Sequence, residues 1–310
     1  MTLPLLPRRD PSGHKGSFGT VAVFGGCTSD GRLMVGAPAL AALAALRAGA
    51  GLARLFMPRD ALEAGLVICP SATGRALDTN PAGDLIAHLA AERFDDAADE
   101  SHAIVVGPGL GTGPGAQALA LRAAGCDRCP IILDADALNS LADVPELARD
   151  FRAAAVLTPH PGEYRRLAGS LGISLDPTDP ATRPRAAEAL AQRLGCIVVL
   201  KGAGTAVSNG QQTWTNSTGG HELATAGTGD TLAGLIAGLA AQHVRLGTPL
   251  GPSNAADRPA LSLFDAARIA VAAHGRAGDL WRERAHASAG LLAAELADLF
   301  PAALEPLRER

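Results

Sequence analysis

The chain has 310 residues, of which 47% are hydrophobic and 3% aromatic, and its formal net charge is −4. A chain of this length can form one large domain with an aliphatic core, and its charge does not create the strong positive field that nucleic acids or anionic membranes attract. The longest apolar stretch, residues 35–46, is interrupted by Gly36 and Pro38 and is too short to span a bilayer. Residues 1–10 lack the charged-then-apolar order of a signal peptide, so we expect a cytoplasmic protein without nucleic-acid or membrane partners.

The cysteines do not indicate a disulfide framework in a chain of this size. Cys126 and Cys129 form a CxxC pair, but no second pair completes a zinc site, and the pair precedes a predicted strand. We therefore expect two loop thiols and no zinc.

Short apolar runs alternate with helical stretches along the chain. Runs rich in Val and Ile, bounded by Gly, Pro or Asp, predict strands at residues 20–24, 53–57, 103–106, 131–134, 155–158 and 197–201. The apolar spacing predicts helices at residues 37–48, 113–124, 162–170, 183–194, 227–242 and 263–284. The alternation predicts an α/β fold with a parallel sheet that is buried on both faces.

The pattern changes after residue 201. Residues 203–208 and 211–215 flank Asn209 and Gly210, a dipeptide typical of tight turns. We expect a β-hairpin here, at an antiparallel edge of the sheet.

Three segments are expected to lie at the surface. Residues 94–101 are interpreted as an exposed loop, and residues 245–262, rich in Pro, Gly, Asn and Asp, as a surface insertion. Residues 1–12 are interpreted as an exposed N-terminal extension. Because no repeat or interdomain linker is visible, residues 13–310 are expected to form a single domain.

A glycine-rich segment is the strongest local signal. Residues 224–230 read ATAGTGD and precede a helix in which Leu232, Leu235, Ile236 and Leu239 occupy one face. The segment therefore leads into the N-terminus of a buried helix, where free N–H groups and the helix dipole favour an anion.

Asp230 has two interpretations. It can cap the helix, a role for which aspartate is well suited. It can also act as a base beside a transferring phosphate and take a proton from an attacking hydroxyl. The helix end alone should hold its pKa low, and a bound phosphate should raise it again. The second role fits its surroundings, because Gly227 and Gly229 let the backbone approach a phosphate without an intervening Cβ.

The AGTGD string at the start of a helix rich in Gly and Ala resembles the anion hole of ribokinase-like kinases. In that superfamily the aspartate is the catalytic base and the preceding amides hold the phosphate. The resemblance implies a ribokinase-like three-layer α/β/α sandwich, with a mostly parallel central sheet and an antiparallel edge hairpin.

Further segments resemble the ADP-dependent (S)-NAD(P)H-hydrate dehydratase family in matching order. They are HKGSFG at 14–19, GAP at 36–38, LRAGAG at 46–51, VGPGLG at 106–111, LDADALN at 133–139, LTPHPGE at 157–163 and VLKG at 199–202. The resemblance covers roughly residues 13 to 300. It implies dehydration of the S-epimer of hydrated NADH or NADPH, coupled to conversion of ADP to AMP and phosphate, with Mg²⁺, as metabolite repair.

The resemblance also bears on assembly. Relatives are often tetrameric, which implies a homotetramer. Many relatives carry an N-terminal epimerase domain, and since only about a dozen residues precede the first motif, we expect no such domain here and a separate epimerase in the pathway.

The resemblance further implies a set of site residues. The substrate would contact Ala37, Gly109, Gly111, His160 and Asp230, the last as catalytic base. The nucleotide would contact Lys201, Gly202, Ala203, Gly204, Thr205, Gly227, Thr228 and Gly229. The metal would be held by Glu163 and Asp134.

Two of these regions also indicate a ligand site from their own residues, without the resemblance. Residues 107–111 join a predicted strand to a predicted helix at the edge where open α/β sheets bind ligands, and three glycines in five residues exceed what a plain turn needs. The GxGxxG spacing of dinucleotide-binding folds is not met there. His160 lies between Pro159 and Pro161, which restrict the backbone and aim the ring, although a structural or solvated role is the alternative.

The acidic residues each have an alternative role. Glu163 occupies the place of the glutamate in the N-x-x-E motif of ribokinase-like proteins, and His160 replaces the asparagine of that motif. In those proteins the glutamate helps to organise Mg²⁺. Glu163 can equally be an acid in the first turn of a helix, where it interacts favourably with the helix dipole. Asp134 and Asp136 lie two residues apart near a strand end and could share one face beside a hydrated Mg²⁺. Capping of a following turn by Asp136 or Asn139 is as good an interpretation.

Lysine occurs only at Lys15 and Lys201, and each directly precedes a glycine, so a phosphate or ligand role is considered for both. In the turn that Lys201 begins, Gly202 and Gly204 permit close backbone approach. Lys201 and Thr205 supply a charge and a hydroxyl.

Two other functions are weighed against the dehydratase. A ribokinase-like kinase of a vitamin precursor would keep Asp230 but make a stable phosphorylated product; the motifs at 14–19 and 157–163 favour the dehydratase. A non-catalytic adenine-nucleotide-binding protein would not need Asp230 and Glu163.

Residues 27–35 depart from the family, which more often has a shorter loop with Ser, Gly and Tyr, so the substrate contacts of this loop are open.

Overall fold

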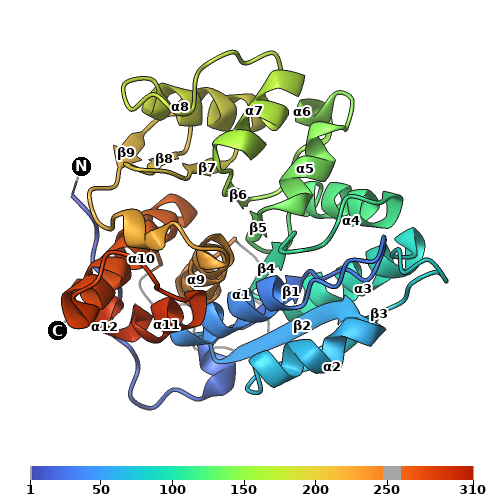
Figure 1. The fold of residues 1–310 in the computed structure, drawn as a ribbon, viewed down its shortest axis with the longest axis horizontal. Coiled ribbons are helices and arrows are strands. Elements are labelled where there is room, and N and C mark those ends of the chain that lie inside the picture. The colour runs from blue at the N-terminus through green and yellow to red at the C-terminus, as the bar shows by residue number, and fades with distance from the viewer. Residues whose placement is uncertain (1, 247–259, 310) are drawn as a thin grey trace.

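A single sheet forms the centre of the molecule. Within the residues that the computed structural model describes, 2–246 and 260–309, its strands are β1 Thr20–Phe24, β2 Leu52–Pro58, β3 Thr73–Leu77, β4 Ala103–Val106, β5 Ile131–Leu133, β6 Ala155–Leu157, β7 Ile197–Leu200, β8 Ala206–Ser208 and β9 Thr213–Thr215. Their order is β3-β2-β1-β4-β5-β6-β7-β8-β9 (Figure 1). Strands β1 to β7 run parallel, while β8 and β9 form an antiparallel hairpin at one edge. The predicted topology is confirmed, although β8 begins at Ala206 and not at residue 203.

Helices cover both faces of the sheet and make the predicted three-layer α/β/α sandwich (Figure 1). One face carries α1 Gly36–Arg47, α2 Arg59–Ile68, α9 Thr228–His243, α10 Leu263–Ala285, α11 Ala293–Asp298 and α12 Phe300–Leu304. The other carries α3 Ala87–Glu100, α4 Pro114–Ala124, α5 Asp136–Ala142, α6 Leu147–Asp150, α7 Pro161–Ser170 and α8 Arg183–Leu194. Within β1, Val21 and Val23 pack into the first layer, and Ala22 and Phe24 into the second. Because both faces are covered, the strands appear in the sequence as continuous apolar runs.

Glycine brings α1 and α9 into backbone contact. A Cβ added to Gly234 would lie 2.0 Å from the Ala41 carbonyl oxygen, so any other residue would push the helices apart. A Cβ on Gly227 would lie 2.8 Å from Leu40 Cδ1. This packing fixes the N-terminus of α9 beside the first half of α1.

The prediction of an exposed loop at residues 94–101 is wrong. Most of this segment belongs to α3, whose buried face consists of Ala90, Phe94, Ala97 and Ala98. Their spacing is that of an amphipathic helix. The acidic residues between them made the segment resemble a loop, and α2 and β3 before it were also not predicted.

The prediction of an exposed N-terminal extension is wrong at Leu6, which is fully buried. Its N–H donates to the Leu307 carbonyl at 2.7 Å, and its carbonyl accepts the Glu309 N–H at 2.9 Å. The two ends of the chain therefore pair with each other. Of the insertion predicted at 245–262, residues 247–259 lie outside the described residues.

Cys126 and Cys129 lie between α4 and β5 in a loop, as predicted, but both are buried. Across residues 2–246 and 260–309, no group of three or more His, Cys, Asp or Glu side chains is placed to hold a metal ion. Within the same ranges, no helix has the length and hydrophobicity needed to cross a membrane.

Candidate active site

The carboxyl ends of the parallel strands meet at one edge of the sheet, and the predicted site residues gather there. The N-terminus of α9 reaches the same edge, because a Cβ on Gly229 would lie 3.2 Å from Lys201 Nζ. Open α/β sheets bind ligands at this edge. The segments that follow β4, β5, β6 and β7 are residues 107–111, 134–139, 158–163 and 201–205.

Lys15 lies at the opposite edge. It begins the 3-10 helix η1, Lys15–Phe18, which precedes β1, and its carbonyl packs against Gly51 just before β2. The two lysines therefore do not share a site, and a ligand role for Lys15 stays a prediction.

Lys201 stands at the centre of an acidic cluster. Its Nζ lies 2.9 Å from Asp134 Oδ1 and 3.8 Å from Glu163 Oε2. Burial acts to lower the pKa of this ammonium, but Asp134 and Glu163 outweigh burial and raise it. Thr158 Oγ1 donates to the same Asp134 oxygen at 2.7 Å and holds it in place. The cluster thus fixes a positive charge at the start of α9.

Asp134 and Asp136 do not form the acidic pair that was considered. Asp136 lies in the first turn of α5, where its Oδ2 accepts the Gly111 N–H at 2.9 Å and its Oδ1 accepts from Asn139 Nδ2 at 3.3 Å. Ala135, between the two acids, has a φ of 50°. The backbone is therefore no longer extended there, and the side chains of residues 134 and 136 do not share one face as they would in a strand. Asp136 therefore braces the preceding turn at Gly111, and the alternative in which it caps a following turn is not found, because no side chain bonds the cap of α5.

Asp230 lies half-buried in the first turn of α9 but does not cap it. The N-cap is Gly227, with a φ of 91°, and no side chain bonds the cap. Burial, and after it the Asp134 carboxylate, raise the pKa of Asp230 to about 7, although Lys201 opposes them. The expectation that the helix end would hold this pKa low without phosphate is therefore wrong, because burial and acidic neighbours dominate. A carboxyl group with this pKa can accept a proton near neutral pH.

Backbone N–H groups line the turn before Asp230. Those of Thr228 and Thr231 bond carbonyls within the loop, at 3.4 and 3.0 Å. Those of Gly229 and Asp230, also in the first turn, have no carbonyl to bond within the helix. The Thr228 hydroxyl donates to the Leu223 carbonyl at 2.9 Å and so shapes the loop. The two amides are the groups available to an anion.

His160 caps α7 with its imidazole. Nδ1 accepts the Gly162 N–H at 2.9 Å, while Glu163 Oε2 accepts the His160 N–H at 2.8 Å, which completes a capping box. Because Nδ1 is an acceptor, the ring proton lies on Nε2, 3.3 Å from Glu163 Oε1. Burial raises the pKa of Glu163, whereas burial and then Lys201 lower the pKa of His160. His160 therefore has the structural role that was its alternative, and its exposed ring still faces the site edge.

The turn after β7 is closed from two sides. Thr205 Oγ1 donates to the Gly202 carbonyl at 2.9 Å, so the hydroxyl considered as a ligand shapes the turn. Arg183, which the sequence analysis missed, is buried beneath the turn and donates to the Ala203 carbonyl. Gly202, Ala203 and Gly204 are exposed, with φ values of 146° and 71° at the two glycines. The backbone of this turn is thus open to a ligand.

The glycines after β4 serve two purposes. A Cβ on Gly107 would lie 1.8 Å from the Asp134 carbonyl oxygen, so this glycine is needed for packing. Gly109 and Gly111 have φ values of 61° and 76°, which favour glycine. A Cβ on Gly109 would lie 3.0 Å from Met34 Cβ and 3.5 Å from Ala37 Cβ. Ala37 and Gly109, both predicted to contact substrate, are therefore neighbours.

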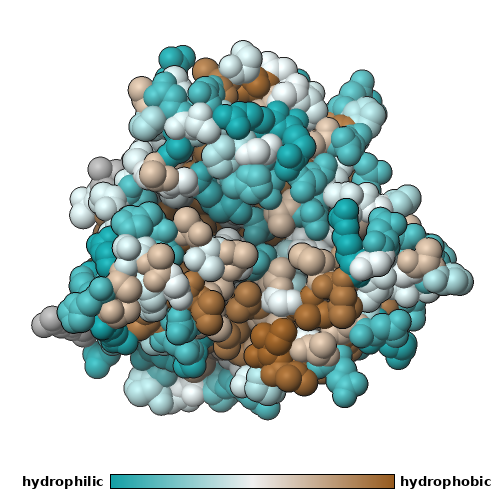
Figure 2. Space-filling model, viewed as in Figure 1, coloured by the Kyte–Doolittle hydropathy of each residue, from teal (hydrophilic) through white to brown (hydrophobic). Residues whose placement is uncertain are grey.

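The loop between β1 and α1 forms a wall beside Gly109. Met34 N–H donates to the Cys27 carbonyl at 3.0 Å and closes a short bridge. Leu33 and Met34 are 64% and 43% exposed. Figure 2 shows hydrophobic residues gathered on this face over β2 and α2. The loop that departs from the family thus places apolar side chains next to the glycines.

The sheet order, the glycine turn at the start of α9 and the carboxyl group beside it define a ribokinase-like protein. The structure is similar to that of a ribokinase-like superfamily protein from Enterococcus faecalis, with a TM-score of 0.73, 22% identity, and coverage of 98% of this chain and 93% of that chain. The family model described as NAD(P)H-hydrate dehydratase matches residues 21–302. The chain belongs to the NAD(P)H-hydrate dehydratase family.

Relatives and solved structures agree with this assignment. The ADP-dependent (S)-NAD(P)H-hydrate dehydratase of Neisseria meningitidis is 37% identical over 93% of this chain and 86% of its own length. A bifunctional NAD(P)H-hydrate repair enzyme of Salinibacter ruber is 40% identical over 81% of this chain. This chain spans only 44% to 53% of such bifunctional relatives. The ADP/ATP-dependent NAD(P)H-hydrate dehydratase of Bacillus subtilis, co-crystallised with ATP and Mg²⁺, has a TM-score of 0.73 and 30% identity, and covers 99% of this chain and 100% of that one.

Proposed function

We propose that the protein dehydrates the S-epimer of hydrated NADH or NADPH and converts ADP to AMP and phosphate. The observation that carries the proposal is the Asp230 carboxyl group. Its pKa is about 7, and it lies beside free N–H groups and the Lys201 ammonium in a chain of this family. The name of the meningococcal relative supports ADP as the nucleotide and the S-epimer as the substrate.

In the first half of the proposed reaction, the hydroxyl oxygen of the hydrate attacks the terminal phosphorus of ADP. A new O–P bond forms while the bond from phosphorus to the AMP oxygen breaks. Asp230 takes the hydroxyl proton. The N–H groups of Gly229 and Asp230, together with Lys201, stabilise the charge on the transferring group.

In the second half, the phosphorylated hydrate expels phosphate. The C–O bond breaks, a proton is lost from the adjacent ring carbon, and the double bond of the dihydronicotinamide is restored. Hydroxide is a poor leaving group and phosphate a better one, which is the physical reason for using a nucleotide in a dehydration. Ala37, Gly109, Gly111 and His160 are proposed to contact the hydrate.

The nucleotide is proposed to lie between two glycine turns. Gly202, Ala203 and Gly204 offer exposed backbone for its ribose and phosphate, with Thr205 closing their turn. Residues 227–229 would receive the terminal phosphoryl group, where the dipole of α9 favours negative charge.

Mg²⁺ fits this site as an ion carried by the phosphates and not as one held in a protein cage. Carboxylate oxygens are ligands that Mg²⁺ prefers, but Asp134 already bonds Lys201 and Thr158. Glu163 is bonded as well, to the His160 N–H, so either carboxylate would reach the ion mainly through the water that Mg²⁺ keeps. When bound, the ion would neutralise phosphate charge.

Assembly as a homotetramer and location in the cytoplasm stay predictions. Light scattering tests the oligomeric state.

Incubation with chemically hydrated NADH and ADP tests the proposal. We expect the absorbance of reduced nicotinamide to recover for the S-epimer fraction, in step with AMP formation. No recovery with either ADP or ATP, together with stable phosphorylation of another alcohol, would place the protein among the kinases.

A further inference from the structure

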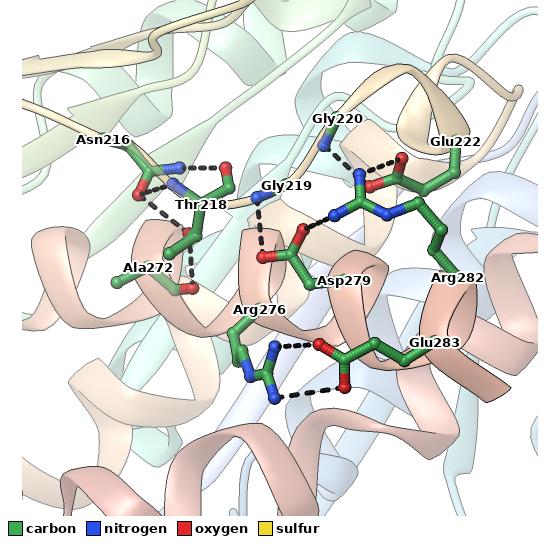
Figure 3. A network of polar contacts seen from close by, with 10 residues as sticks. All are labelled: Asn216, Thr218, Gly219, Gly220, Glu222, Ala272, Arg276, Asp279, Arg282 and Glu283. Carbon is green, nitrogen blue, oxygen red and sulfur yellow. Dashed lines mark hydrogen bonds and ion pairs between the residues drawn. The ribbon is translucent and has the colours of Figure 1, made fainter. Parts of the chain in front are cut away.

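Helix α10 supports residues 216–223, the segment that leads into the glycine turn at residues 227–230, which we name the phosphate loop. Three of its residues, Gly275, Gly278 and Asp279, contact this segment, and a fourth, His274, contacts the loop itself; together we name them the α10 platform. Figure 3 shows the segment lying along α10, with side chains of both parts pointing toward each other. The proposed chemistry gives the platform no role.

The two glycines let the segment lie directly on the helix. A Cβ on Gly275 would lie 2.3 Å from Thr218 Oγ1, and one on Gly278 would lie 2.9 Å from Leu223 Cδ2. Thr218 Oγ1 also donates to the Ala272 carbonyl at 2.9 Å. A side chain at Gly275 would also meet the Thr218 carbonyl oxygen at 2.6 Å and lift the segment off the helix, whereas one at Gly278 would displace the Leu223 and Glu222 side chains.

Two carboxylates anchor the same segment through its backbone. Asp279 Oδ2 accepts the Gly219 N–H at 3.1 Å, and Glu222 Oε1 accepts the Gly220 N–H at 2.7 Å (Figure 3). Arg282 joins the two acids, donating to Asp279 Oδ1 at 2.9 Å and to Glu222 Oε2 at 3.4 Å. Glu222 is only 1% exposed, whereas the Arg282 side chain is 42% exposed, so only the Glu222 end of this ion pair is shielded from water.

His274 reaches the phosphate loop itself. Its Nε2 lies 2.9 Å from the Thr228 carbonyl oxygen. Burial lowers the pKa of this imidazole to about 4, so the ring is neutral, and because a carbonyl only accepts, Nε2 carries the proton. Thr231 Oγ1 donates to the same carbonyl at 2.8 Å. That carbonyl belongs to the peptide whose N–H is that of Gly229, one of the two amides available to the anion.

We propose that His274 is a positioning residue of the phosphate site. Its N–H fixes and polarises the Thr228–Gly229 peptide, because hydrogen bonds to a carbonyl strengthen the N–H of the same peptide as a donor. The rest of the platform holds the preceding segment, so that the loop keeps the conformation that receives the terminal phosphoryl group. His274 bonds the loop and not the nucleotide. The inference rests on the proposed function only in taking this loop as the site of the terminal phosphate of ADP.

Three substitutions of His274 test the proposal. His274→Leu removes the donor, and His274→Asn keeps a polar group that ends too short to reach the carbonyl. His274→Gln places an amide N–H where imidazole Nε2 lies. The matched control is His88→Gln, at an exposed position on α3 in the opposite layer.

The measurement is the ratio of the dissociation constants of AMP and ADP, by calorimetry, with turnover alongside. AMP lacks the terminal phosphoryl group, so Leu and Asn should lower this ratio by roughly three- to tenfold, while Gln should restore it. A merely structural role would weaken both nucleotides alike. An unchanged ratio in the Asn variant, or a Gln variant as poor as Asn, would overturn the proposal, and the Asn variant decides if the Leu variant does not fold. Because binding is measured without hydrate, failure of dehydration activity leaves this test intact.

Discussion

Replacing Asp230 by asparagine should stabilise the folded protein while it removes activity. Burial, and then Asp134, raise the pKa of Asp230 from 3.8 to about 7 in the folded state. Between these values the folded state binds more protons at this group than the unfolded state does. The free energy of unfolding contributed by Asp230 therefore falls as pH rises through this window, and the loss is complete above about pH 7.

The size of the effect follows from the shift in pKa. A rise of this size corresponds to about 4 kcal/mol at most, which is the penalty that the ionised carboxylate imposes at pH 8. Asparagine has nearly the same shape and no charge, so the variant should be more stable than the parent by about 2–4 kcal/mol at that pH. The difference should vanish near pH 4. In a domain of this size each kcal/mol raises the melting temperature by roughly 2 °C.

Thermal unfolding at pH 5 and pH 8 measures this prediction, with turnover assayed on the same samples. Turnover of the variant should fall by at least ~100-fold, because a general base contributes that much or more. Asp60→Asn, at an exposed position in α2, is the control and should change stability by less than about 0.5 kcal/mol. A variant less stable than the parent at both pH values would contradict this prediction, because it would mean that the carboxylate stabilises the folded protein.

Three further predictions concern the same cluster. On the acid side, kcat/KM should rise with pH through about 7, where Asp230 loses its proton. Glu163→Gln should move this rise to lower pH, because Glu163 helps to raise the pKa of Asp230. A rise at the same pH in the variant would contradict the role of Glu163. Lys201→Met should weaken ADP binding by at least about tenfold in calorimetry. It should also move the acid-side rise of kcat/KM to higher pH, because Lys201 lowers the pKa of Asp230. Unchanged ADP affinity would mean that Lys201 does not contact the phosphates. Gly229→Ala should weaken ADP binding because its Cβ would lie 3.2 Å from the lysine ammonium, whereas Gly169→Ala, with nothing within 4 Å, should not.

The sequence predicts the strands well because their burial on both faces leaves continuous apolar runs. It does not predict α3, because Asp95, Asp96, Asp99 and Glu100 lie among the apolar residues, and only the packing of Phe94 shows which face is buried. Local hydrophobic pattern is thus informative where every side chain is buried, and less so where a helix has an acidic outer face.

The site was predictable where its chemistry depends on backbone geometry. The turns at residues 107–111, 201–205 and 227–230 need glycine for close approach, and glycine is visible in the sequence. The raised pKa of Asp230 was not predictable, because it depends on side chains that the sheet brings from other strands. His274 left no local signal either, since its partner is a carbonyl 46 residues away.

Isotope tracing shows whether the substrate hydroxyl is phosphorylated before it leaves. Hydrated NADH prepared in ¹⁸O-water carries the label in its hydroxyl group, and the protein is then incubated with this substrate and unlabelled ADP in ordinary water. We predict labelled inorganic phosphate, because the C–O bond breaks only after the hydroxyl oxygen has bonded to phosphorus. Restored NADH with unlabelled phosphate and the label in water would contradict it, since the hydroxyl would then have left without being phosphorylated.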